Sequence, residues 1–293
     1  MIIVALKGGM GNQMFQYAMG RAIALKNGVP LKLDTSWFTT NKIDTPRAYA
    51  LDHFNIVEEF ASEADIRSLS TNTRLGRYIA KIKGKLLPLK KRTYIVERKM
   101  GYDEEVARLK DNVYLDGFWG TEKYFYDIKD TIIQDFSLRY PSSSENIKMA
   151  ESIRVVNAVA IHVRRGDYIS NATTNAYHGV CSLEYYYNAV QRITETVKDP
   201  HFFVFSDDHE WVRNNFKIDF PMTFFEHNSV DQGHEDVNLM SMCKHNIVAN
   251  SSFSWWGAWL NKNPDKMVYA PEKWFNNSLD TQDLLPASWI KIQ

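Results

Sequence analysis

The sequence predicts an α/β fold that contains two doubly wound parallel sheets. The chain opens with a strand, a glycine-rich loop, a helix and a second strand, and over residues 155–269 short apolar runs again alternate with helical periodicity. Such alternation is typical of parallel strands joined by crossover helices. A turn-rich stretch, residues 140–145, separates the two regions. We therefore expect one α/β domain over residues 1–145 and another over residues 146–293.

The opening unit is defined by its periodicity and by one glycine. Residues 2–6 are apolar and predict a strand, and residues 14–26 place apolar side chains at helical spacing. Gly28 fits the C-cap of this helix, where a left-handed backbone favours glycine. Residues 30–34 resume as a strand. Together these segments predict a β-α-β unit with a polar loop at residues 7–13.

The second half continues the same alternation. Its predicted strands cover residues 155–163, 202–205, 222–225, 247–249 and 267–269, and its predicted helices cover residues 183–197, 209–216, 237–244 and 255–260. Open parallel sheets bind ligands at the carboxyl ends of their strands. The polar residues that directly follow these strands are therefore the first candidates for a site.

Composition argues against several classes of protein. Lysine plus arginine and aspartate plus glutamate each number 35, so the formal net charge is zero and gives no overall attraction to nucleic acid. Cys181 and Cys243 lack metal-ligand spacing and fit a reducing compartment. No apolar run is long enough to span a membrane, and the first residues lack the features of a signal peptide. We expect a cytoplasmic protein.

Residues 74–99 are strongly basic, with Glu97 as the one acidic residue of the stretch. Apolar residues recur at helical spacing up to Pro88, which predicts a basic amphipathic helix. Two interpretations stay open: a core-facing helix with a solvated basic face, or a contact with a membrane surface or an anionic acceptor.

The opening loop resembles a dinucleotide-binding fingerprint in part. Gly9 and Gly11 lie between a strand and a helix, and Asp34 ends the next strand, but Met14 occupies the position of the third glycine. Asn12 and the glutamine after it are amides that can bind a hydroxyl-rich ligand. A nicotinamide site, a tight turn and a polar loop at the mouth of a cleft all remain open.

A dense polar cluster follows the strand at residues 155–163. His162 and Arg164 share one face of the strand end, and Arg165 and Asp167 follow within three residues. Arginine suits a diphosphate because its planar, always charged fork can bind two oxygens at once. Asp167 can hold an arginine or accept a proton. We expect an anion site here rather than a purely structural ion pair.

Two further strand ends carry polar residues. Ser206, Asp207 and Asp208 follow an apolar strand, where carboxylates can accept hydrogen bonds from a ribose or a base; Asp208 also fits a helix N-cap. The Asp-x-Asp spacing of metal-dependent sugar transferases is absent there.

The segment that begins at residue 250 supplies polar groups at a helix start, where backbone N–H groups favour an anion. Its candidate phosphate-binding residues are Asn250, Ser251, Ser252 and Ser254. The serines can equally act as N-caps. The tryptophans that follow fit a core, or one of the segment's aromatic rings stacks on a ligand.

Four segments together resemble the α-1,2-fucosyltransferases of glycosyltransferase family 11. They span nearly the whole chain, in the order of the family: Gly8-Gly-Met-Gly-Asn-Gln-Met-Phe-Gln-Tyr-Ala18, His162-Val-Arg-Arg-Gly-Asp-Tyr168, Phe205-Ser-Asp-Asp208 and Asn250-Ser-Ser-Phe-Ser-Trp-Trp-Gly-Ala258. The resemblance implies a GT-B-like architecture, with two Rossmann-like domains facing across a cleft and GDP-fucose held mainly by the C-terminal one.

The resemblance also implies an activity: inverting, metal-independent transfer of fucose to O2 of a terminal galactose. Arg164 then matches the arginine that binds the donor β-phosphate, with Asp167 and Asn12 as further candidates for catalysis. The other polar residues of the strand ends match positions that hold phosphate, ribose or guanine. The chain looks like a bacterial form, cytoplasmic or peripheral to the inner membrane, that acts on a free or lipid-linked glycan.

Three rival classes remain after this resemblance. A nicotinamide oxidoreductase leaves the Arg164 cluster unexplained, and a non-catalytic sugar- or nucleotide-binding module needs no leaving-group stabiliser. An RNA-binding protein is disfavoured by the zero net charge and by the lack of aromatic residues interleaved with the basic stretch.

Overall fold

The computed structural model describes residues 1–40, 47–70, 88–277 and 279–293, without the side chains of Asp167 and Ser170. The chain divides into two compact units: residues 1–137 with 280–284, and residues 138–279 with 285–293. This division lies earlier than the expected one between residues 145 and 146. Helix α7 (Ser144–Arg154) begins inside the turn-rich stretch, with the Ser143 side chain as its N-cap.

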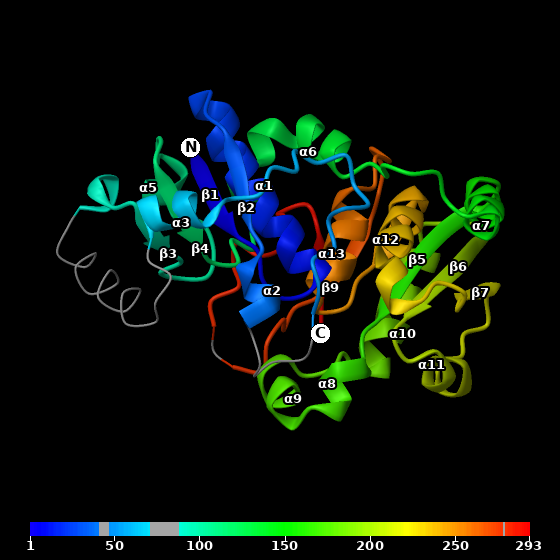
Figure 1. Cartoon of the computed structure of the whole chain (residues 1–293). Coiled ribbons are helices and arrows are strands. Elements are labelled where there is room, and N and C mark those ends of the chain that lie inside the picture. Colours follow the sequence, from blue (N-terminus) through cyan, green and yellow to red (C-terminus); the bar gives the residue numbers. More distant parts are fainter. Residues whose placement is uncertain (41–46, 71–87, 278) are drawn as a thin grey trace. The chain divides into compact units, whose positions relative to one another are not determined.

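The first unit is built on a four-stranded parallel sheet in the order β2-β1-β4-β3 (Figure 1). Its strands are β1 (Ile2–Ala5), β2 (Leu31–Asp34), β3 (Tyr94–Val96) and β4 (Val113–Asp116). Its helices are α1 (Met10–Asn27), α2 (Ser36–Thr40), α3 (Glu63–Leu69), α5 (Glu104–Ala107) and α6 (Lys129–Asp135), with short 3-10 turns η1 (Leu89–Lys91), η2 (Glu122–Tyr124) and η3 (Tyr126–Ile128). The predicted β-α-β opening is confirmed.

Helix α1 packs closely against this sheet. A Cβ at Gly20 would approach the Leu31 side chain to 2.8 Å and the Val4 side chain to 3.3 Å, so a glycine permits the contact. Gly28 ends the helix in the left-handed conformation, with φ 62°, as the sequence predicts. The basic helix expected before Pro88 falls in residues 71–87, which lie outside the described residues.

The second unit is built on a six-stranded sheet in the order β10-β9-β8-β5-β6-β7, in which every pair of neighbours is parallel. Its strands are β5 (Asn157–Val163), β6 (Pro200–Ser206), β7 (Met222–Phe225), β8 (His245–Ile247), β9 (Val268–Pro271) and β10 (Ile290–Ile292). After α7, its helices are α8 (Gly166–Ser170), α9 (Ala172–His178), α10 (Leu183–Thr194), α11 (His209–Asn215), the 3-10 turn η4 (Val230–Gln232), α12 (Gly233–Met242) and α13 (Ser252–Trp259). The doubly wound sheet expected for this half is confirmed.

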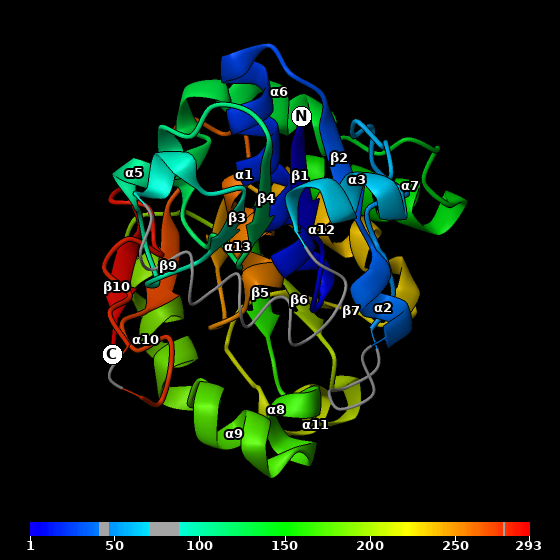
Figure 2. The same cartoon turned by 60° about the vertical axis from the view of Figure 1, so that its left-hand side comes forward.

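Strands β5 and β6 are almost wholly apolar and buried because helices cover both faces of a parallel sheet. Helix α10 supplies one of these covers. Its buried side chains recur on one face, at Tyr185, Ala189 and Ile193, against a core that includes Phe202 and Val204. In both views α8 and α9 lie beyond the carboxyl end of β5 (Figures 1 and 2).

The chain order of the second sheet reverses between β5 and β8. From β5 the chain runs outward through β6 to β7, and it then crosses back to β8 and continues through β9 to β10. Such a switch point opens a crevice at the carboxyl ends of the two central strands, where doubly wound sheets bind ligands.

Among the described residues, no helix is long and apolar enough to cross a membrane.

Candidate active site

Two of the predicted polar segments follow the strands β5 and β8 on either side of the switch point. Strand β5 ends at Val163, directly before Arg164, and β8 ends at Ile247, three residues before Asn250. The Tyr168 hydroxyl donates to the Asn250 carbonyl oxygen at 3.3 Å, which ties the two segments together. The third predicted segment joins them because Ser206, at the end of β6, donates to the Val163 carbonyl at 2.8 Å.

Arg164 is positioned by a carboxylate and by an aromatic ring. Its Nη1 lies 2.9 Å from Oδ2 of Asp207, and its guanidinium carbon lies 5.3 Å from the centroid of the Tyr168 ring. The Arg164 side chain keeps 20% of its surface exposed. The other Asp207 oxygen accepts the backbone N–H of Arg165 at 2.8 Å. Asp207 therefore fixes both the chain and the guanidinium at the end of β5.

The close fit of this turn depends on Gly166. A Cβ at that position would lie 2.3 Å from Oδ2 of Asp207. Any larger residue would displace the carboxylate that orients Arg164. The position of the Arg164 side chain therefore depends on a glycine at residue 166.

Arg165 has contacts of its own. Its Nε donates to Oδ2 of Asp208 at 3.1 Å, and its guanidinium carbon lies 3.5 Å from the centroid of the Trp211 ring. The other Asp208 oxygen accepts the backbone N–H of Trp211, so Asp208 is the N-cap of α11, one of the two roles considered from sequence. Arg165 is thus arranged like Arg164, with its charge balanced by a carboxylate and its guanidinium over an aromatic ring; its side chain keeps 16% of its surface exposed, against 20% for Arg164.

His162 is buried in the same wall and is neutral at physiological pH. Burial lowers the pKa of its imidazole to about 4; the nearby Asp207 carboxylate opposes this shift and Arg164 adds to it. Its ring lies 5.3 Å from that of Phe253, and among the described residues its Nδ1 has no hydrogen-bond partner. His162 therefore contributes no positive charge to this strand end.

The polar residues at the start of α13 are largely engaged within the protein. Ser251 caps the helix by accepting the Phe253 N–H at 3.3 Å, and Ser254 is buried and donates to the Ser251 carbonyl at 3.3 Å. The Asn250 amide donates to the carbonyl oxygens of His178 and Trp274, at 2.9 and 3.2 Å. Ser252, the first residue of the helix, is only partly buried. The tryptophans of the segment, Trp255, Trp256 and Trp259, are buried in the core.

The opening loop lies in the first unit. Gln13 is fully buried, and its amide nitrogen donates hydrogen bonds to the carbonyl oxygens of Gly8 and Ala48, at 3.0 and 2.9 Å. Asn12 is partly buried in the first turn of α1. Asp34 accepts the Tyr114 hydroxyl at 2.6 Å and the Ser36 N–H at 2.8 Å, so both of its oxygens already have protein partners. These contacts favour a structural role for the buried groups of the loop.

Two candidates lie partly or wholly outside the described structure. The backbone of Asp167 belongs to α8, but its side chain is not among those described. Most of the basic stretch falls in residues 71–87. Within the described residues, no three His, Cys, Asp or Glu side chains are grouped so that they could hold a metal ion.

Sequence reasoning missed the aromatic residues that support the site. Tyr168 stacks on His178 with 4.6 Å between ring centroids and 13° between planes, and His178 also contacts Phe275. The Trp211 ring supports the Arg165 guanidinium, as the Tyr168 ring supports that of Arg164. Tyr168 stood inside a recognised motif, whereas no local pattern links it to His178 or to Phe275.

Two parallel-sheet units, with an arginine-rich switch point in the second, define the class of GT-B-like glycosyltransferases. A crystal structure of NodZ α-1,6-fucosyltransferase soaked with GDP-fucose has this fold, with a TM-score of 0.51 and 15% identity over 88% of this chain and 91% of that one. At such identity the likeness establishes the fold. The expected fold class is confirmed.

The chain belongs to glycosyltransferase family 11, whose family model matches residues 79–293. An α-1,2-colitosyltransferase of Escherichia coli is 32% identical over 100% of this chain and 99% of its own length. The O-antigen biosynthesis glycosyltransferase WbnK of Escherichia coli is 33% identical over 98% and 99%. A galactoside α-(1,2)-fucosyltransferase 1 of Rattus norvegicus is 27% identical over 54% and 44%. The resemblance seen in the sequence is confirmed at the level of the family.

Proposed function

We propose that this protein transfers L-fucose from GDP-fucose to O2 of a terminal galactose, with inversion at the anomeric carbon and without a metal ion. One observation carries the proposal. Arg164 lies at the switch point of the second unit, held by Asp207 and Tyr168 with 20% of its side chain exposed. This is the place where a doubly wound sheet binds a nucleotide, and the side chain suits its diphosphate.

The proposed reaction is a single displacement. The acceptor oxygen attacks the anomeric carbon, the bond from that carbon to the β-phosphate oxygen breaks, and its electron pair stays on GDP. Negative charge therefore grows on the β-phosphate in the transition state. A cation fixed beforehand at that phosphate stabilises the transition state more than the ground state. In this proposal Arg164 supplies the charge that a divalent cation supplies in metal-dependent transferases.

The neutral His162 has a complementary part in the proposal. An imidazole that stays uncharged down to a pH of about 4 can exchange hydrogen bonds with a phosphate or ribose oxygen without adding a second charge. The observation that supports this role is that the Nδ1 atom has no hydrogen-bond partner in the described parts of the chain. Asp167 remains the candidate to accept the proton from the acceptor hydroxyl, and Asn12 the candidate of the opening loop.

A second donor is favoured by one observation. The α-1,2-colitosyltransferase is 32% identical along the entire chain, whereas the named fucosyltransferase aligns over 54% of it. Colitose is the 3-deoxy counterpart of L-fucose, so GDP-colitose would use the same diphosphate contacts and the same displacement. The two donors differ in one hydroxyl, which the contacts at Arg164 do not discriminate.

The proposed acceptor is a galactose-terminated glycan, free or lipid-linked. The named O-antigen biosynthesis glycosyltransferase, 33% identical along nearly the whole chain, supports a glycan as the acceptor. Peripheral contact with a membrane through residues 74–99 remains part of the proposal.

The proposal is tested by incubating the protein with GDP-fucose or GDP-colitose and with β1,3- and β1,4-linked galactosides, each with and without a chelator. We expect transfer from at least one of the two donors at a rate that the chelator leaves unchanged. Loss of transfer on chelation would contradict the metal-free mechanism. Transfer from neither donor to any galactoside would contradict the proposed substrates.

A further inference from the structure

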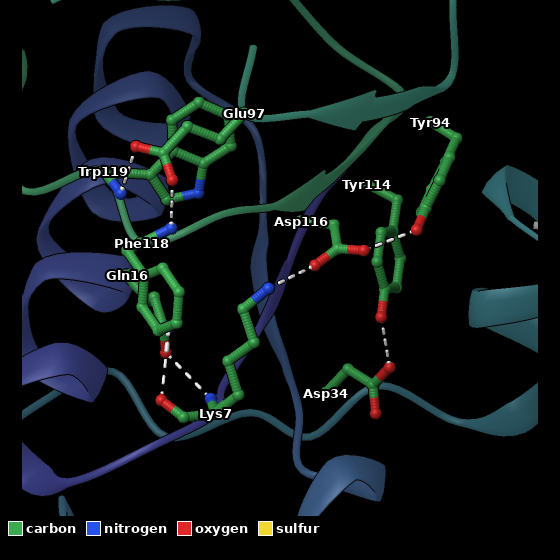
Figure 3. A network of polar contacts seen from close by, with 9 residues as sticks. All are labelled: Lys7, Gln16, Asp34, Tyr94, Glu97, Tyr114, Asp116, Phe118 and Trp119. Carbon is green, nitrogen blue, oxygen red and sulfur yellow. Dashed lines mark hydrogen bonds and ion pairs between the residues drawn. The ribbon is translucent and has the colours of Figure 1, made fainter. Parts of the chain in front are cut away.

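A cluster of polar side chains occupies the carboxyl edge of the sheet in the first unit. Lys7 follows β1, Asp34 ends β2, Asp116 ends β4 and Glu97 follows β3, so all four strands deliver a charged residue to the same edge (Figure 3). The donor proposal does not use this cluster. Yet this edge is where parallel sheets bind ligands.

Lys7 and Asp116 form the centre of the cluster. Lys7 Nζ lies 2.8 Å from Oδ1 of Asp116, with about three quarters of each side chain buried (23% and 24% exposed). The second Asp116 oxygen accepts the Tyr94 hydroxyl, and the Gln16 amide oxygen accepts the Lys7 backbone N–H at 2.9 Å. These bonds hold the ammonium and the carboxylate in one arrangement, which lowers the entropic cost of binding a ligand there.

Glu97 holds the loop that follows β4. Its two oxygens accept the backbone N–H groups of Phe118 and Trp119 at 2.7 and 3.0 Å (Figure 3). Burial raises the pKa of this carboxyl group, and the two N–H bonds oppose the shift. Gly117 completes the turn, because a Cβ there would lie 2.5 Å from the Cβ of Glu97. The loop is therefore clamped by a buried carboxyl group rather than by a regular ladder of hydrogen bonds.

Two features of the same loop are energetically unfavourable. Trp119 has a positive φ of 57°, which is unfavourable for a bulky residue. Its indole Nε1 is buried and has no hydrogen-bond partner in the described part of the chain. Such costs persist where the surrounding structure enforces them, and they concentrate at functional sites.

The result of this arrangement is an aromatic ring held at the sheet edge. Phe118 keeps 47% of its surface exposed although Glu97 accepts its backbone N–H and that of Trp119. The Lys7 ammonium lies 4.9 Å from the centroid of the Phe118 ring. The cluster thus combines a fixed, half-exposed ring with an ammonium and a carboxylate beside it.

This combination suits a neutral sugar better than a nucleotide. A galactopyranose has one face of C–H groups that can cover an aromatic ring, while its hydroxyl groups can donate to a carboxylate and accept from an ammonium. The four charged side chains named at this edge carry one positive and three negative formal charges. A diphosphate would be repelled by this balance, whereas an uncharged sugar would not.

We propose that Phe118, together with the Lys7–Asp116 ion pair, binds the galactose-type ring of the acceptor. This inference rests on the proposed transfer to a galactoside and assigns to it a second binding site, separate from the donor contacts at Arg164. Phe118 and Lys7 are specificity-determining residues in this scheme, because the face and the hydroxyl groups of the ring together select the sugar.

The test compares three variants with the parent protein. Phe118→Leu removes the aromatic face, Phe118→Tyr retains it, and Phe60→Leu is the matched control because Phe60 is 49% exposed on the same unit. For each protein the acceptor KM and kcat are measured with saturating donor, and the dissociation constant for GDP is measured by calorimetry without acceptor.

We expect Phe118→Leu to raise the acceptor KM by about tenfold, the effect of losing one aromatic contact, while GDP affinity stays within about twofold of the parent value. Phe118→Tyr and Phe60→Leu should keep the parent KM within about threefold. An unchanged KM in Phe118→Leu, or a KM raised equally in Phe60→Leu, would overturn the inference. If the parent protein itself transfers sugar to no galactoside, the proposed function fails first and this site fails with it.

Discussion

Replacing Arg164 by alanine should separate the chemical role of this residue from its structural role. At the end of β5 its guanidinium pairs with Asp207 at 2.9 Å, and 20% of the side chain is exposed. A hydrogen bond to a charged group contributes about 1.5–3 kcal/mol. The variant should therefore bind GDP roughly 10- to 100-fold more weakly.

The loss of activity should exceed this loss of binding. Removal of one preorganised group that stabilises transition-state charge costs about 3–4 kcal/mol, or roughly 10²–10³ in kcat. Arg164→Lys should recover part of this loss, because lysine restores the charge but not the planar fork. In the alanine variant the Asp207 carboxylate loses Arg164, but it still accepts the Arg165 N–H, and it is 22% exposed in the parent protein. The variant should therefore still fold.

The assay is steady-state transfer together with calorimetry against GDP. Arg213→Ala is the matched control, since Arg213 also pairs with a carboxylate of the second unit, at 3.0 Å from Glu226, but is 56% exposed. Rates for Arg164→Ala within a few-fold of the parent, or a similar loss in Arg213→Ala, would refute the assigned role.

Three further predictions concern stability. Burial raises the pKa of Asp236 to about 6 from 3.8, so the carboxylate destabilises the folded state increasingly as pH rises from 4 through 6. Asp236→Asn should stabilise the protein by up to about 3 kcal/mol at pH 8 and by only about 0.5 kcal/mol at pH 4, measured by urea unfolding; equal effects at both values would contradict the cause. Gly117→Ala should lower stability by about 1–3 kcal/mol through its clash with Glu97, and an unchanged melting temperature would show that the loop adapts freely. Tyr17→Phe removes the hydroxyl bond to Asp135 at 2.6 Å and should lower the free energy of unfolding by about 1–2 kcal/mol; parent-like urea unfolding would count against that bond.

The second unit could be predicted from sequence because its strands and helices carry strong local patterns. The expected strand at residues 222–225 matches β7, and the helix expected at 183–197 matches α10 (Leu183–Thr194). Strand β10 was missed, since Ile290–Ile292 is three residues long and has no periodicity. Short strands of this kind are defined by their neighbours in the sheet rather than by their own sequence.

The first unit was harder to predict beyond its opening. Strands β3 and β4 were not expected, although Val113–Asp116 is a short apolar run that ends in an acid and precedes Gly117. This run resembles the strand ends of the second unit. The cluster around Lys7 was missed for a different reason. Its central pair joins residues 109 positions apart, and only the parallel pairing of β1 with β4 brings them together.

The motifs at the donor site could be located from sequence, but the residues that each side chain contacts could not. The two neighbouring arginines look equivalent in the sequence. In the structure each has its own carboxylate and aromatic ring: Asp208 and Trp211 for Arg165, Asp207 and Tyr168 for Arg164. Such differences depend on tertiary contacts, which no local pattern encodes.

The central claim is inverting transfer to O2 of galactose, and NMR spectroscopy of the product tests it most directly. The product formed from GDP-β-L-fucose and a galactoside would be purified. The anomeric coupling constant of its fucose and the position of the new linkage would then be determined. We expect an α-linked fucose on O2 of the galactose. A β-linked product would contradict the single displacement, and attachment at any other galactose oxygen would contradict the proposed transfer to O2.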